Sequence, residues 1–181
     1  MKREQALVIL KKNLKNENLQ KHCLAVEASM RHFARYFNQD EEKWALAGLL
    51  HDLDYEETKN DFSKHGFKSV EMLKVYDLED EIINAIRSHS GHVERVSLMD
   101  KVLFAVDSLT GLIIAATLMH PEKKISALDT KFVMRRFKDK RFAAGASREQ
   151  IKSCEDFDMN LEDFISNTIE AMAGIEDVLG F

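Results

Sequence analysis

The sequence contains little proline, glycine or cysteine: one, seven and two residues respectively among 181. This composition leaves little room for long turns and favours helix throughout. The two cysteines, Cys23 and Cys154, are too few for a disulfide framework, and neither belongs to a CxxC pair. No stretch approaches the roughly 18 consecutive apolar residues that span a bilayer, so no membrane partner is expected.

Positive charge is not in excess either, since 26 basic residues face 31 acidic ones and the formal net charge is -5. This balance gives no electrostatic reason to expect nucleic acid as a partner. The first residues lead into a charged helix rather than a signal peptide, and we expect a reduced, cytoplasmic setting. The length fits a single domain over residues 1–181, and the oligomeric state is left open.

Apolar residues recur at three-to-four spacing almost everywhere, which is typical of amphipathic helices packed on one another. The fold class predicted is therefore all-α. Asp40 is a candidate N-cap, because its carboxylate can accept amide hydrogens of the first helical turn. The acidic stretch 52–61 is predicted to be a loop. The predicted helices cover residues 3–15, 19–37, 41–51, 64–75, 79–88, 98–119, 130–137, 147–153 and 161–178.

The pair His51-Asp52 ends the apolar run from Trp44 to Leu50. Two polar groups at the end of a core helix need a partner, and a divalent cation satisfies both. Imidazole nitrogen and carboxylate oxygen suit manganese, iron, cobalt, nickel or zinc, and suit magnesium less well. Similar candidate ligands occur on other predicted helices or near their ends: His22, His65, His89 and Asp107.

Each candidate ligand also has an ordinary structural interpretation. His22 alone is more often a packed histidine, and His65 and His89 lie near helix ends, where histidine is common. His51-Asp52 alone can be a simple helix boundary. Asp107 is harder to explain in this way, because an unpaired carboxylate in an apolar helix costs several kcal/mol, roughly. The joint occurrence of all six favours a metal site.

The order of these residues resembles the HD superfamily of metal-dependent phosphohydrolases. Gly48-Leu-Leu-His-Asp-Leu53 resembles the HDIG-type signature, and Lys64-His-Gly66 resembles the segment of the next histidine. Ala85-Ile-Arg-Ser-His89 and Phe104-Ala-Val-Asp-Ser108 resemble the segments that follow. The resemblance covers about residues 18–117, which leaves 118–181 as a helical C-terminal extension without a family match.

The resemblance implies an all-helical HD-domain bundle that holds one or two divalent transition metals per chain. It implies that His22, His51, Asp52 and Asp107 hold the first metal. His65 and His89 would hold a second, with Asp52 bridging. Leu53-Asp54 replaces the Ile-Gly of the signature, and no Gly-Tyr-Pro motif is present, which weakens assignment to the signalling-nucleotide phosphodiesterase branch.

The expected activity is hydrolysis of a phosphate mono- or diester of a small molecule by metal-activated water. A nucleotide as substrate rests on the resemblance alone. Asp52 is expected to bridge the cations, while Asp54 or Glu56 could accept a proton or hold a ligating histidine. Lys64 is a candidate for stabilising transition-state charge. The alternative for these loop residues is simple solvation.

Two other functions remain open at this stage. A di-iron site with these ligands could activate oxygen, as similar HD-type oxygenases do; iron in the purified protein and oxygen-dependent turnover would support it. The domain could instead be a non-catalytic binding module whose metal only holds the helices together. That module would unfold on metal removal and would hydrolyse no phosphoester.

Overall fold

The computed structural model describes all 181 residues, and every regular element is a helix, which confirms the all-α prediction. The α-helices are α1 (Arg3–Asn13), α2 (Glu17–Tyr36), α3 (Glu41–Leu50), α4 (Tyr55–Thr58), α5 (Phe67–Leu73), α6 (Asp80–Ser88), α7 (Leu98–Met119), α8 (Thr130–Lys138), α9 (Arg148–Lys152), α10 (Leu161–Ala173) and α11 (Glu176–Leu179). Three short 3₁₀ helices are η1 (Phe62–Lys64), η2 (Ile125–Ala127) and η3 (Ser153–Phe157).

Side-chain caps fix the starts of the helices that carry the site. The Asp40 carboxylate accepts hydrogen bonds from the amides of Glu42 and Lys43, at 3.0 and 3.1 Å, as predicted for the start of α3. Ser97 and Asp100 cap the start of α7 reciprocally. The observed bounds of α7 are the predicted ones, because this capping box marks its start and the break at His120 marks its end.

Three predictions of local structure were wrong. The segment 52–61 contains the short helix α4. Asp54, which directly precedes this helix, is buried instead of solvated. The helix predicted over 64–75 begins only at Phe67. Gly66, directly before it, has a φ of 80°, which is not a helical backbone conformation, so the helix does not include the preceding residues. The closing helix predicted over 161–178 breaks after Ala173 into α10 and α11.

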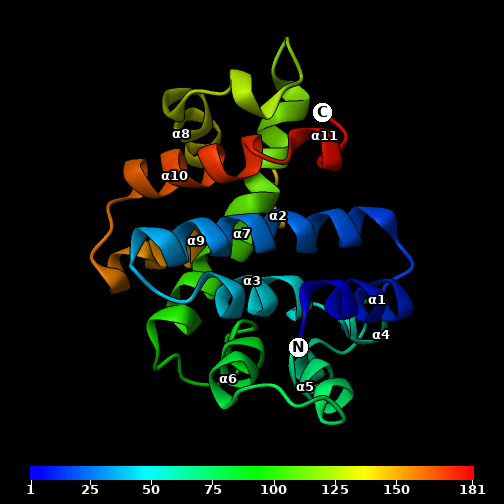
Figure 1. Cartoon of the computed structure of the whole chain (residues 1–181). Helices are drawn as coiled ribbons and strands as arrows, with labels where there is room; N and C mark the ends of the chain where they lie inside the picture. Colours follow the sequence, from blue (N-terminus) through cyan, green and yellow to red (C-terminus); the bar gives the residue numbers. More distant parts are fainter.

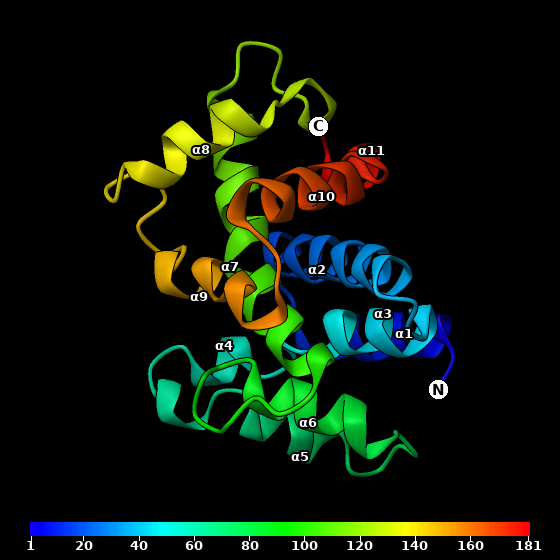
Figure 2. The ribbon, with the colours of Figure 1, turned by 90° about the vertical axis from the view of Figure 1, so that its left-hand side faces the viewer.

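Helix α7 runs through the middle of the molecule, and α2 and α10 cross it (Figures 1 and 2). By length and composition α7 is the one helix that could cross a membrane. A buried core helix has the same composition, and 56% of its apolar window lies inside the fold. It packs against α2, α6, α8, α9 and α10, so we interpret it as the core helix of the bundle.

Helices α2 and α3 lie in close contact at Gly48. A Cβ at this position would lie 2.9 Å from the carbonyl oxygen of Val26 and 3.0 Å from the Cα of Glu27, both backbone atoms. Glycine is therefore required for this contact. The close approach brings the end of α3, with His51 and Asp52, against the face of α2 that carries His22.

Candidate metal centre

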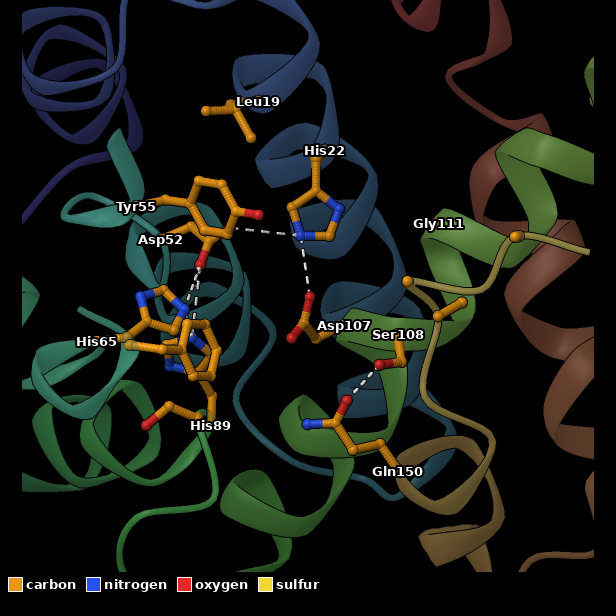
Figure 3. Close-up of a pocket in the computed structure, with 15 residues that line it drawn as sticks. Leu19, His22, Asp52, Tyr55, His65, His89, Asp107, Ser108, Gly111 and Gln150 are labelled. Atoms are coloured by element: carbon orange, nitrogen blue, oxygen red, sulfur yellow. Dashed lines mark hydrogen bonds and ion pairs between the residues drawn. The ribbon is translucent and has the colours of Figure 1, made fainter. Parts of the chain in front are cut away.

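The six predicted ligands lie together, although they come from five separate parts of the chain. Figure 3 shows five of them, all except His51. His22 belongs to α2 and Asp107 to α7, while the others directly follow helices: His51 and Asp52 after α3, His65 after η1 and His89 after α6. Helix ends thus converge on one point at the side of the central helix.

One half of the cluster is formed around His22 and Asp107. The Nε2 atom of His22 lies 3.0 Å from Oδ1 of Asp107 and 3.7 Å from Oδ2 of Asp52. The Nε2 atom of His51 lies 3.7 Å from the same oxygen of Asp107. The donor atoms of His22, His51 and Asp107 all lie within 4.8 Å of one another, so one cation could contact all three.

The other half is formed around His65 and His89, whose Nε2 atoms lie 3.1 Å apart. Both face Oδ1 of Asp52, at 3.2 and 3.5 Å, and His51 faces it at 3.5 Å. His51, Asp52 and His89 form a second group of donor atoms within 4.8 Å. Because Asp52 presents one oxygen to His22 and the other to these histidines, it lies between the two halves.

Hydrogen bonds on the far side of each ring orient the imidazoles. The Nδ1–H of His51 donates to the Gly48 carbonyl at 2.8 Å, and that of His89 donates to the Ile86 carbonyl at 2.6 Å. His65 donates from Nδ1 to Oδ1 of Asp54 at 2.8 Å. When the ring is neutral, such bonds leave Nε2 as the lone-pair donor and turn it inward, which is how metal-ligating histidines are usually held.

Asp54 is a buried positioning residue, which the sequence alone did not distinguish from a solvated loop carboxylate. Its side chain accepts from His65 through Oδ1 and from the Ser69 amide through Oδ2, at 3.0 Å. Burial alone would raise the pKa of Asp54, but these hydrogen bonds hold it below its usual range. The carboxylate therefore stays ionised and fixes the His65 ring.

The Nε2 atom of His51 is buried and has no hydrogen-bond partner. An unsatisfied buried nitrogen costs roughly 1–3 kcal/mol, and a cation beside it would remove that cost. Burial lowers the pKa of His51, but the charges of Asp52 and Asp107 outweigh it and raise this pKa to about 9. The same imidazole thus attracts a proton or, in its neutral form, a metal.

Two other predicted catalytic residues lie elsewhere. The Glu56 carboxylate accepts from the backbone amide of Lys15 at 2.6 Å, so it joins α4 to the end of α1. Lys64 is exposed and pairs with Asp61 at 2.6 Å. Neither side chain lines the cavity beside the metal cluster. The structure therefore gives no support to a catalytic role for Glu56 or Lys64.

A cavity of about 480 Å³ opens onto the cluster. Tyr55 and Phe62 line it on the side of His65, and Phe62 is 51% exposed. The opposite side comes from α7 and the C-terminal third of the chain, where Ser108 and Gln150 meet (Figure 3). The sequence analysis assigned none of these four residues a place in the site, since no spacing relates them to the ligands. No lysine or arginine lines the cavity.

Residues 19–112 match the family model of the HD domain. Among similar proteins is Ribonuclease Y of Staphylococcus epidermidis, which is 31% identical over 136 residues, or 74% of this chain and 26% of the relative. Ribonuclease Y of Sulfurovum sp. is 32% identical over 52% of this chain and 18% of its own length. The chain thus spans about a quarter or less of these relatives. No solved structure matches it.

Proposed function

This chain belongs to the HD domain family. We propose that it is a metal-dependent phosphohydrolase whose substrate is a small phosphorylated molecule, and that this molecule is a nucleotide. The unpartnered Nε2 of His51 carries this proposal. It faces two carboxylates and lies among three further imidazoles, and the other five ligands line an open cavity. Four neutral imidazoles and two carboxylates are a suitable ligand set for manganese, iron, cobalt, nickel or zinc.

A divalent cation bound here would lower the pKa of water toward neutrality and polarise a phosphoryl oxygen. The protein's own contribution is to hold the ligands in place. His22, His51 and Asp107 form one half of the cluster, Asp52 lies between the halves, and His65 and His89 form the other half. Asp54 keeps the His65 ring in the orientation that points Nε2 at Asp52.

The shape and lining of the cavity support a small substrate with an aromatic ring. Its volume of about 480 Å³ falls within the roughly 300–1,000 Å³ of small-molecule sites. The Phe62 ring lies 4.6 Å from the His65 ring and remains half exposed at the cavity. Stacking of a nucleobase on an aromatic side chain contributes roughly 1–3 kcal/mol, so Phe62 offers a surface for a base.

A second candidate is hydrolysis of a phosphodiester in RNA, which the name Ribonuclease Y of the similar proteins favours. The cavity lining offers no cation for neighbouring phosphates, and the chain is acidic overall. Binding to a polynucleotide normally depends on several lysine or arginine contacts. We therefore rank RNA second.

The experiment is a substrate screen with protein reconstituted separately with each candidate metal. The panel holds nucleoside monophosphates, cyclic nucleotides, a dinucleotide and single-stranded RNA. We expect release of phosphate from a nucleoside monophosphate, lost in Asp52→Ala and kept in Asp61→Ala, an exposed aspartate outside the cavity. Cleavage of RNA alone would replace the substrate proposed.

Two results would reject hydrolysis itself. Oxygen-dependent turnover with iron, and no phosphate release under nitrogen, would support the oxygenase alternative. Metal-loaded protein that hydrolyses nothing on the panel, yet unfolds when the metal is removed, would support a binding module.

A further inference from the structure

One wall of the cavity lies outside the segment that matches the HD family. Residues 19–112 supply the metal cluster and the aromatic side, whereas Ala143, Gly145, Ala146 and Gln150 supply the facing wall. This C-terminal wall is therefore the part of the cavity that lies beyond the matched family segment.

Arg148 holds the wall in place. Its guanidinium donates to the backbone carbonyls of Ala143 and Ala146 at 2.8 and 2.7 Å, and to that of Asp139 at 2.9 Å. It also donates to carbonyls at the end of α8 and in the turn that follows. One rigid guanidinium thus bonds six backbone carbonyls, those of residues 136, 137, 139, 142, 143 and 146. The wall is fixed by the fold.

Gln150 connects this wall to the metal centre. Its Oε1 accepts a hydrogen bond from the hydroxyl of Ser108, the residue after Asp107 on α7. Figure 3 shows this pair across the cavity from Tyr55 and His65. With Oε1 engaged by Ser108, the Nε2 group of Gln150 keeps two N–H donors that no protein atom accepts.

The polar groups that remain in the cavity are uncharged. Besides Gln150 they include the Ser90 hydroxyl, which is buried without a partner, and the phenol of Tyr55. A second phosphate on the substrate would find no cation here, and burying an unpaired charge is costly. These groups suit an uncharged part of a substrate that carries hydrogen-bond acceptors.

We propose that Gln150 determines substrate specificity by donating from Nε2 to the uncharged, non-phosphate part of a phosphate ester, such as the sugar and base of a nucleoside. The inference rests on the proposed function only in taking the metal cluster as the binding point of the phosphate. Because Ser108 sets the orientation of Gln150 relative to Asp107, this donor lies at a fixed position from that cluster.

The test compares two non-hydrolysable ligands on metal-loaded protein by titration calorimetry. One is the methylenephosphonate analogue of a nucleoside 5′-monophosphate, measured for adenosine and uridine. The other is methylphosphonate, the head group alone. Gln150→Met removes the donor without adding charge, and Gln39→Leu, at an exposed glutamine, is the matched control. Metal content and melting temperature are measured for each variant.

We expect Gln150→Met to lower the affinity for the nucleoside analogue about 3- to 10-fold, which is the effect of losing one neutral hydrogen bond. The affinity for methylphosphonate should be unchanged. Ser108→Ala, which frees the amide to rotate, should give a smaller loss in the same direction. Equal affinities of Gln150→Met and the unmodified protein for the nucleoside analogues, or an equal loss for both ligands, would overturn the inference. Protein that binds selectively through Gln150 but hydrolyses no phosphoester would overturn only the proposed function.

Discussion

Oδ1 of Asp54 lies 2.8 Å from Nδ1 of His65, and both side chains are buried. This bond turns Nε2 of His65 toward Asp52, at 3.2 Å, where the second group of candidate ligands meets. A residue two positions after the His-Asp pair thereby sets the geometry of a ligand eleven positions further on.

Asp54→Asn should weaken binding of the second cation about 10- to 100-fold, the usual cost of losing a partner of a ligating histidine. The first cation should bind with unchanged affinity, because His22 and Asp107 do not contact Asp54. Competition with a chromogenic chelator measures both affinities. Asp61→Asn, at an exposed aspartate, is the control. Unchanged affinity for both cations in Asp54→Asn would refute the positioning role.

Gly48→Ala should destabilise the fold by about 1–3 kcal/mol, the usual cost of overpacking. The added Cβ would meet backbone atoms of α2, which cannot move aside as a flexible side chain can. Urea unfolding measures the change. Gly111→Ala on α7, where a Cβ meets nothing within 4 Å, should be neutral or stabilising. A Gly48→Ala protein as stable as the unmodified one would show that α2 and α3 can move apart at this contact without loss of stability.

The metal-free protein should lose stability as the pH rises from 7 to 10. The carboxylates around His51 and His65 raise both pKa values from 6.5 to about 9, although burial opposes this. A raised pKa in the folded state contributes stability that is complete below 6.5 and is lost as pH rises through about 9. Thermal unfolding at several pH values tests this.

Metal binding should show the complementary behaviour. A cation must displace the protons of His51 and His65, so its affinity should increase as the pH rises toward 9, and binding at pH 7 should release protons. Calorimetry in buffers of different ionisation enthalpy counts those protons. Binding at pH 7 without proton release would contradict the protonation state assigned to the metal-free cluster.

Arg148→Met should loosen the cavity wall while leaving the metal cluster intact. Removing the guanidinium leaves the carbonyls of Ala143, Ala146 and Asp139 without their common donor. We expect faster proteolysis at the lysine and arginine of 140–141 and unchanged metal content. Lys152→Met, at an exposed lysine of α9 that does not line the cavity, is the control because it leaves both cleavage sites in place. If the Arg148→Met protein were cleaved at residues 140–141 no faster than the unmodified protein, the wall would be held by other contacts.

The sequence predicted the features that depend on local spacing and residue type. The bounds of α7 and the cap at Asp40 followed from local patterns, and the six ligand candidates followed from their order along the chain. The burial of Asp54 was missed because an acidic stretch has the composition of a loop, and only its contacts with His65 and Ser69 reveal a core position.

The cavity wall could not be predicted for a different reason. Gln150 reaches the site through a hydrogen bond to Ser108, 42 residues earlier, and Arg148 acts on backbone carbonyls that accept it regardless of side-chain type. Neither interaction produces a sequence periodicity or a motif. Long-range contacts of this kind depend on how α9 packs on α7, which only the folded structure shows.

The most direct test of the metal centre is elemental analysis of protein purified without a metal-chelating column, beside Asp52→Ala and His65→Ala. We predict nearly two equivalents of transition metal per chain, lost in Asp52→Ala and reduced to one in His65→Ala. Absence of metal from the unmodified protein, even after reconstitution, would contradict the metal-dependent hydrolase and leave the cluster as a network of buried histidines and carboxylates.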